Sequence, residues 1–249
     1  MMDARTEWIA TDLDGTLFSR LTSEGAVAAT WRLLDDGSTQ PSSWMPRARH
    51  AFLSKVSTLF RVVPVTARDA ASFSRVQIDG VPLRDGAVLA NGAILLQPGT
   101  MIPDPAWDAE IGPQLAQWAQ PLIEMAARLS EASGGTVVPR LVESHTPHPA
   151  YLVAKATDGF WSELSGRRLR EVLAPFKCRV AELGRELQVL PPPTSKRIGV
   201  AAFARAYCGG EPAVLALGDM PEDLGFLREA EFLAAPADST LARRWCDGV

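Results

Sequence analysis

The feature that most constrains the fold is a short apolar run, residues 8–11, followed by Asp12-Leu13-Asp14-Gly15-Thr16. The apolar run is typical of a buried strand, and Gly15 marks a turn at its end. At such a turn both carboxylates can converge on one pocket. The strand, the carboxylate pair and the turn together suggest a phosphoryl-transfer site, in which one carboxylate attacks phosphorus and the other moves a proton. The competing interpretation is an Asp-rich turn that only closes a strand, because Asp and Gly are ordinary turn residues.

Short apolar runs with strand character alternate with helical patterns along the chain, which favours an α/β fold with a parallel sheet. In open parallel sheets the ligand crevice lies beyond the carboxyl ends of the strands, so residues far apart in sequence gather there. Strands are expected near 7–13, 61–66, 87–90, 213–217 and 231–234, and helices near 46–60 and 195–207.

Three further segments occur in an informative order. Thr66 ends an apolar run, Lys196 lies in Pro-Thr-Ser-Lys-Arg-Ile-Gly, and Asp219 and Asp223 lie in Leu-Gly-Asp-Met-Pro-Glu-Asp. With the first segment, they match the four motifs DxDGT, strand-ending Thr or Ser, Lys, and GDxxxD. The chain therefore resembles the haloacid dehalogenase-like superfamily of phosphohydrolases. A fourfold ordered match is much more specific than any single motif.

The resemblance implies a role for each catalytic side chain. Asp12 is the expected nucleophile, which forms an aspartyl-phosphate, and Asp14 is the expected general acid and then base. Lys196 is expected to bridge Asp12 and the phosphoryl oxygens, and Thr66 to donate its hydroxyl to them. In the competing interpretations, Thr66 is an ordinary β-branched strand residue and Lys196 a solvated lysine at the start of a helix.

The resemblance also implies Mg²⁺, a hard cation that prefers oxygen ligands. The expected ligands are Asp12, the backbone carbonyl of Asp14, the side chain of Asp219, and Asp223 directly or through water. The two later aspartates have an alternative role as turn and helix-cap residues. Glu222 stands where relatives usually have Asn, and it adds negative charge beside the expected metal.

The middle of the chain, residues 101–187, has a different pattern from its flanks. It reads as a helix at 113–133, strands at 136–142 and 150–154, a helix at 161–173 and a strand at 178–181. This order indicates a small α+β module inserted into a Rossmann-like core with a central parallel sheet, residues 1–100 and 188–249. The placement resembles the C2-type cap, B subtype, of the branch that includes sucrose-phosphate and mannosyl-phosphoglycerate phosphatases and the Cof-like hydrolases.

Five residues are candidates for substrate binding. Arg68 either reaches the substrate or pairs with a surface carboxylate. Asn91 lies in a segment after which those families place their cap, and an Asn-Gly hairpin turn is its other interpretation. The remaining candidates are cationic residues of the expected cap, Arg140, Lys155 and Arg185.

Bulk composition excludes several classes of protein. The net charge of −4 and the pI near 5.5 argue against an extended basic face for nucleic acid or an anionic membrane. No apolar stretch approaches the length of a membrane span, and the cysteines are far apart, as expected of reduced thiols in a cytoplasmic protein. These cysteines are Cys178, Cys208 and Cys246.

We therefore expect a Mg²⁺-dependent phosphomonoesterase for a small phosphorylated metabolite, a sugar phosphate above all, with the cap selecting the substrate. One alternative is a sugar phosphomutase with the same nucleophile, and another is a non-catalytic metabolite-binding relative. Two local features are unusual: the long, turn-rich segment 22–45, which forms either a flap or a surface loop, and Pro64 inside an expected strand. The oligomeric state is not indicated by the sequence.

Overall fold

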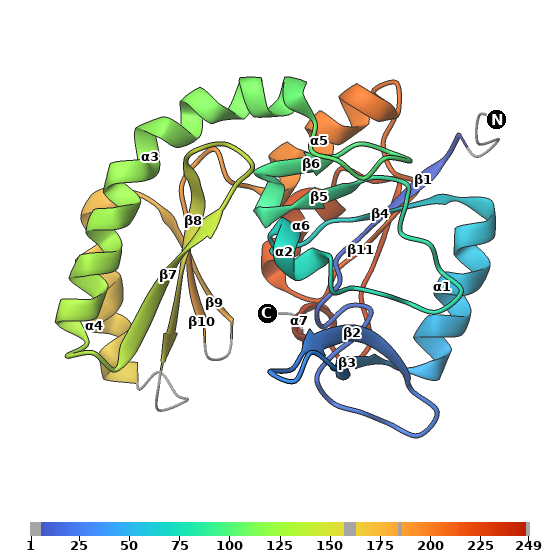
Figure 1. The fold of residues 1–249 in the computed structure, drawn as a ribbon, viewed down its shortest axis with the longest axis horizontal. Helices are drawn as coiled ribbons and strands as arrows, with labels where there is room; N and C mark the ends of the chain where they lie inside the picture. The colour runs from blue at the N-terminus through green and yellow to red at the C-terminus, as the bar shows by residue number, and fades with distance from the viewer. Residues whose placement is uncertain (1–5, 157–162, 184–185, 248–249) are drawn as a thin grey trace. The chain divides into compact units, whose positions relative to one another are not determined.

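The computed structural model describes residues 6–156, 163–183 and 186–247. It divides into two compact units, one made of Met1–Pro103 with Lys196–Val249 and the other of Asp104–Ser195 (Figure 1). The α/β fold class is confirmed, because the first unit has a parallel sheet and helices between its strands. Among the described residues, no helix combines the length and the apolar character needed to cross a membrane.

The parallel sheet of the first unit has β1 (Trp8–Thr11) near its centre. This strand is buried along its whole length, as a central strand with both faces covered should be. The strand order is β12 (Phe232–Ala234), β11 (Leu215–Leu217), β1 and β4 (Arg61–Pro64).

A hairpin continues the sheet beyond β4. Val65 forms a parallel bridge with Val88 in β5 (Ala87–Leu89), and β5 pairs with β6 (Ile94–Leu96) in the antiparallel direction. The helices of this unit are α1 (Arg47–Leu59), α2 (Ala70–Phe73), η1 (Ala90–Gly92), α5 (Lys196–Tyr207), η3 (Pro221–Asp223), α6 (Leu224–Leu227) and α7 (Thr240–Asp247).

Pro64 is accommodated without a bulge because its missing amide faces away from β1. The amide of Val65 donates to Thr11 in β1, whereas that of Thr66 donates to Val88 in β5, at 2.8 Å in both cases. Since amides alternate between the two sides of a parallel strand, residue 64 faces the β5 side. On that side the amide of Val62 donates to the carboxylate of Asp85 at 2.8 Å, because β5 pairs with this segment only from Val65 onward.

The segment 22–45 folds as a second antiparallel hairpin. Its strands are β2 (Val27–Leu33) and β3 (Thr39–Met45). Ser38 donates its amide to the Asp36 side chain at 2.9 Å, which closes the turn between the strands. The segment is therefore a defined hairpin rather than a plain surface loop.

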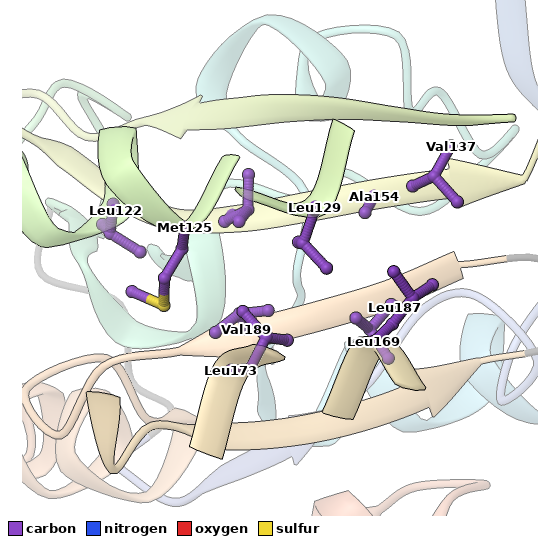
Figure 2. Packing of buried hydrophobic residues seen from close by; sticks show 10 residues of the cluster. Leu122, Met125, Leu129, Val137, Ala154, Leu169, Leu173, Leu187 and Val189 are labelled. Atoms are coloured by element: carbon purple, nitrogen blue, oxygen red, sulfur yellow. The ribbon is translucent and has the colours of Figure 1, made fainter. Parts of the chain in front are cut away.

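The second unit is a four-stranded antiparallel sheet with helices packed on it. Figure 2 shows its core, in which leucine and methionine side chains of two helices meet leucine, valine and alanine side chains of the strands. The strand order is β7 (Val137–Glu143), β8 (Pro149–Ala156), β10 (Glu186–Leu190) and β9 (Arg179–Leu183), and the helices are α3 (Pro105–Ala132), α4 (Glu163–Leu173) and η2 (Ala174–Phe176).

Two sequence-based expectations about this unit are wrong in detail. Helix α3 begins at Pro105 rather than Pro113, because Asp104 caps it by accepting the amide of Ala106 at 2.8 Å. Pro113 lies inside this helix, which curves along its length (Figure 1). The core boundary expected at residues 187 and 188 falls within β10, a strand that the sequence reading missed.

Candidate active site

The loop that follows β1 is shaped by Gly15. Asp12 comes directly after the strand, and its amide donates to the carbonyl of Leu217 in β11 at 2.8 Å. Gly15 has a φ of +91°, and a Cβ atom there would lie 2.2 Å from Oδ2 of Asp219. Only glycine permits both the left-handed backbone and this close approach. The loops after β1 and β11 therefore meet at one place.

Lys196 links these two loops from a third element. It is the first residue of α5, and its Nζ donates to Oδ1 of Asp12 and to Oδ1 of Asp223, each at 2.7 Å. One turn later, a Cβ on Gly199 would lie 2.5 Å from the Cα of Gly92. The start of α5 is thus held against the turn between β5 and β6, which fixes the position of the lysine.

Three carboxylates form a compact cluster around this ammonium group. Asp12, Asp219 and Asp223 each offer an oxygen within 4.8 Å of the others. The hydroxyl of Thr16 lies 3.0 Å from Oδ2 of Asp12 and 3.1 Å from Oδ1 of Asp219. The second oxygen of Asp223 accepts the amide of Asp219 at 3.1 Å. An all-oxygen donor set of this kind fits a hard divalent cation.

The electrostatics of the cluster show an excess of negative charge. Burial raises the pKa of Asp12 to about 8, against the opposing effect of Lys196, and burial also raises the pKa of Asp219. Burial by itself would lower the pKa of Lys196, but Asp12 and Asp223 raise it above its usual value. The ammonium group is therefore firmly protonated, and its single positive charge does not balance the negative charge of the three carboxylates. Oε2 of Glu222 is also buried, without a hydrogen-bond partner among the described residues.

Thr66 and Asn91 lie together at the carboxyl ends of neighbouring strands. Thr66 is buried, and its hydroxyl accepts the amide of Arg68 at 3.2 Å. The amide of Asn91 donates to the carbonyl of Thr66 at 3.0 Å, and Asn91 has a φ of +53° in the turn between β5 and β6. The hairpin-turn interpretation of Asn91 therefore describes its backbone. Its role toward a substrate stays a prediction.

Arg68 pairs with Asp14. Its Nε and Nη2 donate to the two carboxylate oxygens at 2.6 and 2.7 Å, and its Nη1 donates to the carbonyl of Ser72 at 3.1 Å. The guanidinium group also lies over the ring of Phe18, 5.5 Å from its centroid. Of the two interpretations of Arg68, carboxylate pairing describes the structure, and the partner is the expected general acid.

The candidates in the expected cap belong to the second unit. Arg140 lies in β7, and Lys155 in β8 pairs with Glu186 at 2.7 Å. Arg185 lies outside the described residues. The binding roles of these three residues stay predictions.

Two residues in the first unit were missed by sequence reasoning. Thr16, which bridges two carboxylates, is the last residue of the DxDGT motif, and that position could have identified it. Arg49 in α1 donates to the carbonyls of Gly15 and Thr16 at 3.0 and 3.1 Å, and to Asp238 at 2.6 Å. Nothing in its helical pattern distinguishes Arg49 from any other surface arginine.

No protein-family model and no curated protein sequence matches the chain. Solved structures do match it over nearly its full length. The sucrose-phosphatase of Synechocystis sp. PCC6803, solved with sucrose and phosphate, aligns with a TM-score of 0.59 and 16% sequence identity. The alignment covers 98% of this chain and 88% of the sucrose-phosphatase chain. A HAD subclass IIB sugar phosphatase aligns with a TM-score of 0.53 and 14% sequence identity, and this alignment covers 97% of this chain and 99% of the phosphatase chain.

A third structure comes from work on a trigonal-bipyramidal intermediate in a phosphoryl-transfer superfamily. It has a TM-score of 0.55 and 15% identity, covering 97% of this chain and 98% of its own. At such low identities the likeness is one of fold.

Proposed function

We propose that this chain, which has the fold of the HAD-superfamily sugar phosphatases, is a Mg²⁺-dependent phosphomonoester hydrolase for a small phosphorylated metabolite, specifically a sugar phosphate. The observation that carries this proposal is the contact of one largely buried ammonium, Lys196, with two carboxylates, Asp12 and Asp223. An isolated Asp-rich turn would not need a cation at its centre. The convergence of two distant loops on one lysine, which a third element carries, supports a catalytic site.

Mg²⁺ fits the donor set because the three clustered side chains offer only carboxylate oxygens. Asp12, Asp219 and Asp223 would hold it, together with the backbone carbonyl of Asp14. When bound, the ion would neutralise negative charge on the carboxylates and on the phosphate.

Asp12 is the proposed nucleophile. One of its carboxylate oxygens forms a bond to phosphorus while the bond from phosphorus to the alcohol oxygen breaks, which leaves an aspartyl-phosphate. Asp14 gives a proton to the departing alcohol oxygen and later takes one from the water that hydrolyses the intermediate. Arg68 makes one contact to each oxygen of Asp14, and each oxygen has two acceptor sites, so the protonated acid can donate its proton while Arg68 still orients the carboxyl group.

Lys196 and Thr66 are proposed to stabilise the phosphoryl oxygens. The ammonium lies 2.7 Å from Oδ1 of Asp12 and so would approach a phosphoryl group attached to that carboxylate. The hydroxyl of Thr66 would donate to another phosphoryl oxygen while its own oxygen still accepts the Arg68 amide. Before any substrate arrives, the ammonium group is held by the carboxylates of Asp12 and Asp223, and the Thr66 hydroxyl by a backbone amide.

The test is phosphate release from a panel of sugar phosphates with Mg²⁺, compared with release in excess chelator. We expect Asp12→Asn to lower kcat by about 10⁴-fold or more, as loss of a nucleophile does. Asp36→Asn is the matched control, because Asp36 is an exposed aspartate that closes the β2–β3 turn.

Circular dichroism would show that both variants are folded. Full activity in the Asp12→Asn variant would remove the proposed nucleophile. Isomer formation in place of phosphate release would identify a mutase. Tight binding of sugar phosphates by the wild-type protein without turnover would identify a non-catalytic relative.

A further inference from the structure

A pocket of about 750 Å³ lies in the first unit beside Asp14. The β2–β3 hairpin lines one side, and Arg68 and Arg75 line another. All its lining residues lie between positions 14 and 75, so the pocket belongs to the first unit alone. Of its lining residues, only Asp14 and Arg68 were singled out by the sequence motifs described above.

Backbone contacts hold the walls of this pocket in place. Ser19 and Trp44 exchange amide-to-carbonyl hydrogen bonds at 3.0 and 2.7 Å, which ties β3 to the loop that carries Asp14. The amide of Trp31 in β2 donates to the carbonyl of Arg75 at 3.0 Å, which ties the other strand to the segment after α2. The hairpin is therefore fixed on both sides, and the pocket between these segments is preformed.

The charge of the pocket is strongly positive in a protein whose net charge is −4. Four arginines line it, and Asp14 is the one acidic residue among its described lining residues. Arg68 is committed to Asp14. The other three form no ion pair within the part of the chain that the structure describes: Arg20, Arg32 and Arg75.

The remaining walls suit a small polar organic group. The hydroxyls of Thr30 and Ser42 lie 2.8 Å apart, and both residues line the pocket. The side chains of Trp31 and Trp44 provide flat apolar area on the same hairpin. Guanidinium groups bind carboxylate and phosphate oxygens in a bidentate manner, so this combination favours an organic oxyanion over a neutral ligand.

We propose that this pocket binds a second oxyanion, a carboxylate or a phosphate, carried by the leaving alcohol of the substrate. The inference rests on the proposed function, in which Asp14 protonates the leaving oxygen. Because Asp14 also lines the pocket, the rest of the leaving alcohol extends from that oxygen toward Arg20, Arg32 and Arg75. The preferred substrates are then phosphate esters with an additional acidic group.

The test measures binding in an Asp12→Asn background with Mg²⁺, so that no turnover is needed. Isothermal titration calorimetry compares 3-phosphoglycerate with glycerol 3-phosphate, which lacks the carboxylate. It also compares fructose 1,6-bisphosphate with fructose 6-phosphate, which lacks the second phosphate. We expect the ester with the extra oxyanion to bind about tenfold more tightly in at least one pair. The pair that shows this preference distinguishes the carboxylate from the phosphate.

The added substitutions Arg20→Gln and Arg75→Gln, together or singly, should bring that ratio close to one. The matched control Arg244→Gln, an exposed arginine in α7 outside the pocket, should preserve it. Equal binding within both pairs, no detectable binding of any ester, or a preference that survives both pocket substitutions would overturn the proposal. Phosphate release by the wild-type protein is measured separately, so loss of the proposed function is recognised independently of the pocket.

Discussion

Arg68 binds both carboxylate oxygens of Asp14, through Nε at 2.6 Å and Nη2 at 2.7 Å. The same guanidinium group is held by the carbonyl of Ser72 and by the ring of Phe18. Asp14 itself has a half-exposed side chain, and it would have several rotamers available without this partner. The ion pair therefore sets the direction of the proposed general acid and ties the segment after β4 to the loop after β1.

Replacement of Arg68 by Gln should lower kcat by about tenfold, because Asp14 loses two charge-assisted hydrogen bonds that orient it. Arg68→Lys should recover only part of the loss, since an ammonium group cannot bind both oxygens in the same plane. Steady-state kinetics on one sugar phosphate give kcat and KM separately. The control is Arg197→Gln, which breaks the exposed ion pair of Arg197 with Glu229. An unchanged kcat in Arg68→Gln would show that Asp14 needs no partner.

Gly15→Ala tests the close approach of the loops after β1 and β11. Gly37→Ala is the matched control, because Gly37 also has a positive φ, of +81°, but a Cβ there meets nothing within 4 Å. Both variants should lose about 1–2 kcal/mol of the free energy of unfolding from backbone strain. Only Gly15→Ala should also weaken Mg²⁺ binding, by about tenfold or more, since its Cβ displaces Asp219. Equal Mg²⁺ affinity of the two variants by calorimetry would contradict this.

Mg²⁺ affinity should rise as the pH increases from about 6 to about 8. Burial raises the pKa of Asp12 to about 8, so in the absence of metal this carboxyl binds a proton below that pH. A metal ligand must be deprotonated, and Mg²⁺ binding therefore releases the proton. The gain should approach about tenfold per pH unit at most for one proton.

Calorimetry at pH 7 in two buffers of different ionisation enthalpy measures this proton release directly.

The same pKa shift fixes how the stability of the metal-free protein depends on pH. The pKa of Asp12 is raised on folding from 3.8 to about 8, so the folded protein binds a proton that the unfolded chain releases, and the metal-free protein should lose stability as the pH rises toward 8. The melting temperature without Mg²⁺ should therefore fall between about pH 6 and 8. An Mg²⁺ affinity that is the same at both ends of this range would refute the coupling.

The sequence was most informative where a local hydrophobic pattern ends at a residue that must reach the carboxyl edge of the sheet. The strand before Asp12 and the helix that begins at Lys196 were both expected, because an apolar run and a helical period are visible without a partner. That their side chains meet follows from the rule that ligands gather at the carboxyl ends of parallel strands. The contact of Lys196 with Asp12 therefore has a physical basis that the sequence already contained.

Elements defined by their partners were harder to predict. Strand β10 was missed because Leu187 and Val189 give a short alternating pattern that acquires meaning only against β8 and β9. The pairing of Arg68 with Asp14 and the contacts of Arg49 depend on side-chain directions across loops. Sequence spacing does not encode these directions. The β2–β3 hairpin was ambiguous because its turn signals and polar strands also suit an irregular loop.

The boundary between Ser195 and Lys196 has a consequence for how such a protein can diversify. The chain re-enters the first unit at Lys196, the residue that donates to Asp12, and Gly199 packs against Gly92 within the next turn of helix. The position of the lysine is thus set by contacts within the first unit, to Asp12 and Gly92. The module between residues 104 and 195 can therefore be lengthened, shortened or exchanged while the ammonium group keeps its place beside Asp12.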